Sequence, residues 1–269
     1  MMAAHSAIHP SAVVEDGARL GEGVSIGPFC HVGPQVVLGD GVVLKSHVAV
    51  AGRTTVGART QVFPFASVGH QAQDLKYRGE TASLTIGTDC IIREGVTLNP
   101  GTEGGGLETV IGNRCAFLAN SHVGHDSRLG DGVILSNNVM IAGHVTVGNH
   151  VIFGGGAAVI QFTRVGDHAF VGGLAGLEND LIPFGMVMGN RARLNGLNLV
   201  GLKRHGFARE DIHALRSAYK DLFESSEGTL RQRAEAVAAA YEGVALVRRV
   251  TDFILVETDR RFCTPALEG

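Results

Sequence analysis

The sequence predicts a mainly β protein, in which a parallel β-helix of hexapeptide repeats is followed by a C-terminal α-helical domain. Two observations carry this prediction. Apolar, mostly aliphatic, residues recur every six positions from Ile8 to Val68 and, after interruptions, onward to Leu177. That period belongs neither to an α-helix nor to a simple alternating strand. Beyond Met188 the six-residue pattern stops, and apolar residues recur at helical spacing instead.

In such a fold three hexads make one triangular turn of 18 residues. Residue n therefore lies under residue n+18, about 4.8 Å away at the spacing of parallel strands. The apolar residue of each hexad points inward, and the Gly that often follows it, as in Ile26-Gly27 and Val165-Gly166, gives the corners backbone freedom. Because no coil can bury its own face, stability is cooperative along the stack, and an end coil has to be covered.

Two segments interrupt the repeat within the expected β-helix, residues 1–189. Residues 69–84 lack hexad aliphatics and carry Asp74 and Lys76, and the pattern resumes in phase at Ile86. We expect this segment to be a loop outside the prism, where binding groups usually lie. Residues 100–108 are rich in Gly and shift the phase by one residue; a plain loop and a functional loop are equally compatible with this pattern.

The tail, residues 190–269, is expected to be the helical domain. Phe207–Ser225 reads as an amphipathic helix with Ile212 and Leu215 on its apolar face. The opposite face carries three basic residues, which are candidates for docking an acidic partner protein: Arg209, Arg216 and Lys220. Thr229 is placed to cap a second helix, and residues 244–258 are a candidate third. We expect these helices to cover the last coil and close its edge.

Composition excludes several functional classes. The formal net charge of −3 gives the whole chain no nucleic-acid or membrane-surface character. No apolar stretch approaches the length of a membrane span. The four Cys are scattered without metal spacing, and Met1–Pro10 do not resemble a signal peptide. We therefore expect reduced thiols, a cytoplasmic location and no cofactor.

A polar group follows the inward residue Val123. His125 and Asp126 occupy the next bend, and adding 18 places Gly143 above His125 and His144 above Asp126. This arrangement suits acyl transfer, because an imidazole can take a proton from a hydroxyl and a neighbouring carboxylate can fix its tautomer. The Gly143 N–H is a candidate donor to a developing oxyanion.

Two other readings of these residues stay open. His122, His125 and His144 are also compatible with ordinary polar corner positions. Clustered His on hexapeptide prisms can bind zinc between subunits, but these three do not fall one or two coils apart in one column, so we expect no metal.

Several longer motifs are more specific to one protein family than the hexad repeat is. They are Ile26–Cys30, Leu44–His47, Gln73–Tyr77, Gly104–Leu107, His122–Asp126, Ala142–His144, Gln161–Phe162, Val171–Gly173 and Gly201–Phe207. With these motifs the chain resembles the UDP-N-acetylglucosamine O-acyltransferases, which catalyse the first step of lipid A biosynthesis, over nearly its whole length. The repeat already begins at Ile8, so we expect no uridine-binding domain before the hexads, unlike in the related N-acyltransferases of glucosamine.

The resemblance implies a left-handed β-helix, a homotrimer with active sites in the clefts between subunits, and an (R)-3-hydroxyacyl group delivered by acyl carrier protein. It implies that His125 is the general base for the 3-hydroxyl of UDP-N-acetylglucosamine, that Asp126 orients it and that Gly143 forms the oxyanion hole. The implied contacts to sugar, acyl chain and nucleotide are Asp74, Lys76, His122, His144, Gln161, Asn198 and Arg204. Gly173 matches a position where a bulky residue shortens the accepted chain, so we expect long donors unless Leu174 or Leu177 closes the groove.

Three positions depart from the common family pattern. Asn99 and Ile160 stand where His is frequent, and Val200 stands where Glu often contacts the nucleotide. Some similar enzymes acylate a 3-amino sugar nucleotide and form an amide, which is the alternative substrate. An alternative of a different class is a non-catalytic or metal-binding hexapeptide solenoid.

Overall fold

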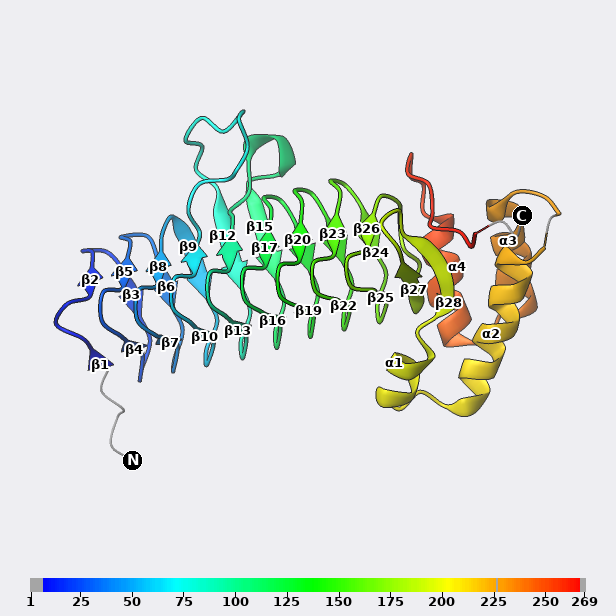
Figure 1. Cartoon of the computed structure of the whole chain (residues 1–269), viewed down its shortest axis with the longest axis horizontal. Helices are drawn as coiled ribbons and strands as arrows, with labels where there is room; N and C mark the ends of the chain where they lie inside the picture. The colour runs from blue at the N-terminus through cyan, green and yellow to red at the C-terminus, as the bar shows by residue number, and fades with distance from the viewer. Residues whose placement is uncertain (1–6, 226, 267–269) are drawn as a thin grey trace.

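The chain forms a rod of short parallel strands with a group of helices at one end (Figure 1). The structure, a computed structural model, describes residues 7–225 and 227–266. The extreme ends of the two expected domains, residues 1–6 and 267–269, lie outside the described residues. The strands run along three faces, which we call sheets A, B and C.

Most strands in the three sheets are two residues long, and up to β26 each sheet takes every third strand of the chain. Sheet A holds β1 (Ala7–Ile8), β4 (Ser25–Ile26), β7 (Val43–Leu44), β10 (Gln61–Val62), β13 (Ile91–Ile92), β16 (Ala116–Phe117), β19 (Ile134–Leu135), β22 (Ile152–Phe153), β25 (Phe170–Val171), β27 (Gly185–Met188) and β28 (Arg193–Leu197). Sheet B holds β2 (Val13–Val14), β5 (His31–Val32), β8 (Ala49–Val50), β11 (Ser67–Val68), β14 (Thr97–Leu98), β17 (His122–Val123), β20 (Met140–Ile141), β23 (Ala158–Val159) and β26 (Gly176–Leu177). Sheet C holds β3 (Arg19–Leu20), β6 (Val37–Leu38), β9 (Arg53–Val56), β12 (Ser83–Ile86), β15 (Glu108–Ile111), β18 (Arg128–Leu129), β21 (Thr146–Val147) and β24 (Arg164–Val165).

The register confirms the 18-residue turn. Ile8 pairs with Ile26, and Val123 pairs with Ile141. From β1 to β26 the last residue of each strand is the hexad residue, and nearly all of these side chains are buried in one continuous core. Ile8 is 46% exposed, because the described chain has no further coil on that side.

The two interruptions leave the prism as loops on the same edge of the rod (Figure 1). Val62 pairs with Ile92 across the first loop, instead of with the residue eighteen positions on. Leu98 pairs with Val123 across the second loop, which contains a short 3₁₀ turn, η1 (Glu103–Gly105). The loops meet where the Glu103 N–H donates to the Glu80 carboxylate at 3.4 Å. Both loops therefore rise beside the coils that carry His125.

The end of the rod differs from the sequence-based expectation. β28 pairs antiparallel with β27, so a strand and not a helix closes the edge of sheet A. The sequence did not predict this hairpin, because β28 carries no hexad spacing. The expected domain boundary at residues 189 and 190 falls between these two paired strands, and the division stays a proposal.

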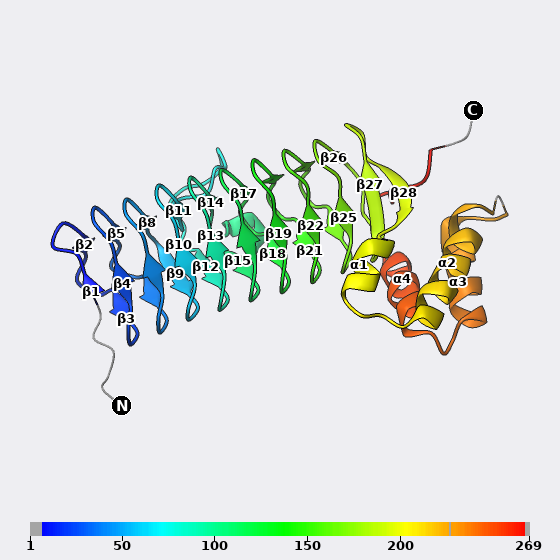
Figure 2. The ribbon, with the colours of Figure 1, turned by 60° about the horizontal axis from the view of Figure 1, so that its bottom comes forward.

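Four helices follow the hairpin (Figure 2): α1 (Leu199–Arg204), α2 (Arg209–Phe223), α3 (Leu230–Ala240) and α4 (Ala245–Leu255). The structure confirms the three longer helices within a few residues of their predicted bounds. It also confirms Thr229 as the cap of α3, where its hydroxyl accepts from the Gln232 N–H in a capping box. α1 was missed because six residues give too short an apolar pattern to recognise.

Among the helices of the described residues, none is long and apolar enough to cross a bilayer. The four Cys are buried, and none of them forms a disulfide in the described residues.

Candidate active site

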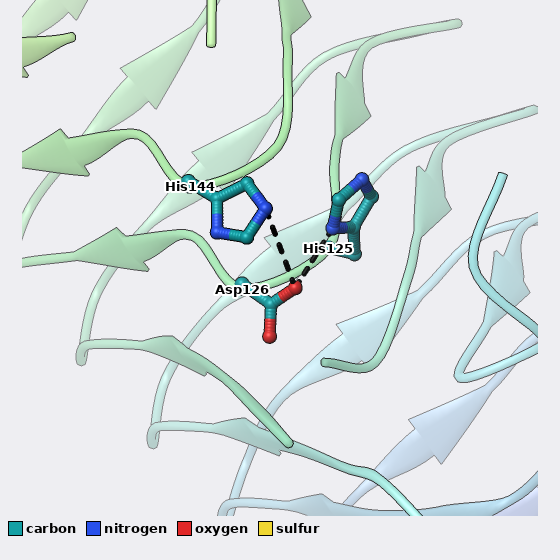
Figure 3. A group of neighbouring side chains, drawn as sticks. All are labelled: His125, Asp126 and His144. Atoms are coloured by element: carbon teal, nitrogen blue, oxygen red, sulfur yellow. Dashed lines mark hydrogen bonds and ion pairs between the residues drawn. The ribbon is translucent and has the colours of Figure 1, made fainter. Parts of the chain in front are cut away.

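His125 and Asp126 lie at the corner that follows β17, between sheets B and C. Val123 is fully buried and anchors the end of the strand. Asp126 adopts a left-handed backbone with φ of 60°, a conformation that Asp tolerates better than most residues. The corner therefore turns the side chains of His125 and Asp126 toward each other, as Figure 3 shows.

The Asp126 carboxylate is fully buried and satisfied by hydrogen bonds. His125 Nδ1 lies 2.8 Å from its Oδ2, and both side chains are almost completely removed from solvent. Thr102 donates its N–H to Oδ1 at 2.8 Å and its hydroxyl to Oδ2 at 2.6 Å. An ionised carboxylate can only accept hydrogen bonds, so it fixes the His125 proton on Nδ1 and leaves Nε2 as the acceptor.

Gly143 lies on the coil above, where the sequence placed it. A Cβ built on Gly143 would stand 2.6 Å from His125 Cε1 and Nε2, so the backbone of Gly143 lies directly against the Nε2 edge of the imidazole. Within the described chain, no acceptor is bonded to the Gly143 N–H. A backbone donor beside a potential base is the arrangement that stabilises an oxyanion in acyl transfer.

Two further imidazoles surround the pair. The His144 ring lies edge-on to the His125 ring at 4.9 Å and stacks on the Phe162 ring at 4.4 Å. Burial lowers the pKa of His144, against the opposing effect of the Asp126 carboxylate. Burial also lowers the pKa of His122, which shares a 2.7 Å hydrogen bond with the Thr97 hydroxyl. Both rings are therefore held neutral near pH 7 and can exchange hydrogen bonds with a polar ligand.

The 69–84 loop brings Asp74 and Lys76 to the same region. The charge of Asp74 acts on both His125 and His144, and that of Lys76 acts on His144. The N–H of Lys76, which donates to the Asp74 carboxylate at 2.9 Å, lowers the pKa of Asp74. Asp74 is thus an anion at neutral pH, placed to accept hydrogen bonds from a ligand.

Asn99 holds this loop in place, a role that sequence reasoning missed. Its buried amide accepts from the Gln73 N–H at 3.4 Å and donates to the carbonyls of His70 and Gln71 at 3.3 Å. The departure from the frequent His at this position therefore has a structural use. No signal in the periodic pattern could have indicated it, because its partners lie in the loop.

A groove of about 460 Å³ runs along the outer face of sheet B beside these residues. It is lined by Gln73, Thr97, His122, Met140, Ile141, Ala142, Ala158 and Val159. One end is polar, at His122, and the other is lined by small apolar residues. This gradient fits a ligand with a polar head and an aliphatic chain.

The other expected substrate residues lie farther along the rod. Gln161 is exposed on the next coil, and its carbonyl accepts from Arg260. Gly173 is exposed, and a Cβ there would be in ordinary contact, 3.4 Å from the Gly155 carbonyl oxygen. Leu177 is fully buried inside the prism, so the concern that it closes an outer groove is wrong; Leu174 is 78% exposed and still faces outward.

Asn198 and Arg204 lie at the helical end, not on the coils of His125 (Figure 1). The Asn198 amide accepts from the Gly201 N–H at 3.0 Å, capping α1, and donates to the His168 carbonyl at 2.9 Å. Arg204 is exposed in the last turn of α1. Their nucleotide contacts stay predictions.

The expected docking face is exposed on α2, as predicted for Arg209, Arg216 and Lys220. Arg216 and Lys220 also line a hollow of about 190 Å³ between α2 and the β28–α1 segment. Docking itself stays a prediction.

The metal alternative can be examined at the same site. Ligand atoms of His125, Asp126 and His144 lie within 4.8 Å of one another, a different set from the three His considered above. The Asp126 oxygens already accept three hydrogen bonds. A cation there would displace the His125 proton, so the donor set favours a base and its orienting carboxylate.

Comparison with known proteins gives a consistent result. Residues 180–263 match the family described as UDP N-acetylglucosamine O-acyltransferase, domain 2, and residues 17–52 and 108–143 match the bacterial transferase hexapeptide family. A protein of Methylobacterium radiotolerans, named acyl-[acyl-carrier-protein]–UDP-N-acetylglucosamine O-acyltransferase, is 68% identical over 96% of this chain and 95% of its own length. A protein of the same name from Sinorhizobium fredii is 53% identical over 100% of this chain and 99% of its own.

Solved structures agree. The UDP-N-acetylglucosamine O-acyltransferase of Moraxella catarrhalis is 37% identical, with a TM-score of 0.91 over 95% of this chain and 98% of that one. The Arabidopsis UDP-N-acetylglucosamine acyltransferase is 32% identical, with a TM-score of 0.84 over 96% and 99%. The fold is the left-handed parallel β-helix with C-terminal helices that the sequence indicated.

Proposed function

The chain belongs to the UDP-N-acetylglucosamine O-acyltransferase family, and we propose that the site around His125 performs the family's reaction. The enzyme is an acyltransferase that moves an (R)-3-hydroxyacyl group from acyl carrier protein to the 3-hydroxyl of UDP-N-acetylglucosamine. This is the first step of lipid A biosynthesis. The observation that carries the site assignment is the His125–Asp126 bond directly beside the backbone of Gly143.

The geometry supports a general-base mechanism. His125 Nε2 takes the proton of the sugar 3-hydroxyl as its oxygen attacks the thioester carbonyl carbon. The Gly143 N–H donates to the oxyanion that forms, and the Asp126 carboxylate stabilises the imidazolium. When the intermediate collapses, the carbon–sulfur bond breaks and the imidazolium returns its proton to the leaving thiolate.

The surrounding groups support a role in binding. His122 and His144, held neutral by burial, and the anionic Asp74 are suited to hydroxyl and amide groups of the sugar. The groove on sheet B offers the acyl chain an apolar wall at Ala158 and Val159. Gln161 lies one coil beyond Gly143, whereas Gly173, Asn198 and Arg204 lie farther along the rod. We assign the contacts of these last three residues to an extended ligand or to a neighbouring subunit.

A homotrimer is part of this proposal. The outer face of sheet A presents Ile91, Ile134, Ile152 and Phe170, all at least partly exposed in one chain. A row of apolar residues along a rod is typical of a subunit interface, and cyclic closure is the usual solution for identical chains. Light scattering at micromolar concentration should give the mass of three chains; a monomer would contradict the shared cleft.

The activity is tested with UDP-N-acetylglucosamine and a mixed pool of acyl carrier proteins, with products identified by mass spectrometry. The wild type should form the 3-O-acyl product, whose ester is cleaved by hydroxylamine, whereas an amide from a 3-amino sugar would resist it. His125→Ala should lose about 10²–10⁴-fold of turnover, the usual contribution of a general base. Near-normal turnover in a clean His125→Ala preparation would remove His125 from this role.

A further inference from the structure

The 100–108 loop closes directly over the catalytic carboxylate. Thr102, itself only 4% exposed, donates hydrogen bonds to both carboxylate oxygens of Asp126, one from its N–H and one from its hydroxyl. A Cβ built on Gly105 would stand 2.0 Å from Asp126 Cγ, and one built on Gly101 would stand 2.8 Å from Asp126 Oδ1. Gly at these positions therefore lets the loop backbone approach the Asp126 side chain more closely than a residue with a Cβ would allow.

The Thr102 hydroxyl has no competing structural use. Thr102 precedes the η1 turn but makes no side-chain capping bond to it. Its hydroxyl donates to Asp126 Oδ2, the same oxygen that lies 2.8 Å from His125 Nδ1. Two donors on one oxygen fix the plane of the carboxylate, and that plane sets the direction of the His125 ring.

We propose that Thr102 is a positioning residue of the acyl transfer, which acts on His125 through Asp126. The 100–108 loop is then a part of the active site that completes the carboxylate's hydrogen bonds and excludes water from it. This inference rests on the proposed role of the His125–Asp126 pair. Thr102 thereby differs from Asn99, whose side chain holds the loop bearing Asp74 and Lys76 and makes its hydrogen bonds in the described chain to Gln73, His70 and Gln71 instead of to the pair.

Thr102→Val removes the hydroxyl but keeps the side-chain shape and the backbone N–H. Because one hydrogen bond to a charged group is lost, kcat should fall about 10- to 100-fold. The KM for UDP-N-acetylglucosamine should change less than about threefold, because the ground-state contacts remain. Thr102→Ser restores the hydroxyl and should recover most of kcat.

Thr60→Val is the matched control. Thr60 is equally buried, and its hydroxyl donates to the Gly87 carbonyl and accepts from the Cys90 N–H, away from the site. This variant should lower the melting temperature while leaving kcat per folded enzyme unchanged. A loss of kcat in Thr60→Val equal to that in Thr102→Val would show that any buried Thr matters in the same way, and would overturn the inference.

A double-mutant cycle with Asp126→Asn separates the inference from the mechanism. If Thr102 acts through the carboxylate, Thr102→Val should cost little further kcat in the Asp126→Asn background. If the two losses of kcat are fully additive, the role of Thr102 is overturned but that of the pair is not. The same holds if Thr102→Val has normal kcat while Asp126→Asn is disabled. Normal kcat in Asp126→Asn overturns the proposed pair and the inference together.

Discussion

Replacing Gly143 by Ala should disable catalysis by a steric route that can be worked out from the structure. The new Cβ would lie 2.6 Å from His125 Cε1 and Nε2, whereas ordinary contact begins at 3.4 Å, so the imidazole has to retreat by about 0.8 Å. The bond from His125 Nδ1 to Asp126 is 2.8 Å long. A retreat of that size directed away from Asp126 lengthens this bond to about 3.6 Å, beyond hydrogen-bonding distance.

The expected result is a fall in kcat of about 100-fold, or about 2.7 kcal/mol of activation free energy. The KM for UDP-N-acetylglucosamine should change by less than about threefold, because the binding residues keep their places. Steady-state rates measured by mass spectrometry at saturating donor give both constants. The melting temperature should stay within a few degrees of the wild type.

Gly33→Ala is the control for this prediction. Gly33 lies at the same corner of an earlier coil, one position before the residue that matches Gly143, and its nearest neighbour for a new Cβ is the Ala51 Cα at 3.5 Å. This variant should keep normal kcat. The reasoning is refuted if Gly143→Ala turns over within about threefold of the wild type, or if Gly33→Ala loses as much.

Three further predictions follow from other parts of the molecule. Burial, with the charge of neighbouring His205, lowers the pKa of His168 to about 4. As the pH falls, the imidazole is therefore protonated in the unfolded chain before it is protonated in the folded one. Folding stability is lost between about pH 6.5 and pH 4, by at most about 2 kcal/mol at pH 5. His168→Phe, which keeps ring contact with Phe184, should reduce this acid dependence in thermal melts. Gly173→Met should shift donor preference from long chains, about 12 to 14 carbons, to shorter ones in a competition assay, because a bulky side chain at this position would meet the methyl end of the acyl chain. Charge reversal at Arg216 and Lys220 should raise the KM for the carrier-bound donor but not for the sugar nucleotide, and added salt should mimic it.

Each of these predictions has an outcome that contradicts it. An unchanged slope of stability against pH in His168→Phe would assign the acid sensitivity to other groups. A 10-carbon preference in the unmodified enzyme would show that another residue, such as the exposed Leu174, limits the groove. Equal donor KM values in the double reversal and in a reversal of Arg248, an exposed residue on α4, would place the carrier protein elsewhere.

The sequence by itself determined the parts of the protein that repeat. Stacking in register forces residue n+18 over residue n, so the contact between His125 and Gly143 followed from counting along the chain. The same rule predicted which residues form the buried core of the prism and where the two loops leave it. Thr229, by its position before an apolar run, indicated the start of α3.

Only the tertiary structure decided the contacts made by segments without a period. Thr102 reaches Asp126 across 24 residues and Asn99 reaches the 69–84 loop across 26 to 29, through loops whose paths no local pattern specifies. The β27–β28 hairpin and the short α1 were hidden for a related reason, since the neighbours that stabilise them are brought together only by folding. A repeat carries its geometry from one coil to the next, whereas a loop takes its shape from the surface on which it packs.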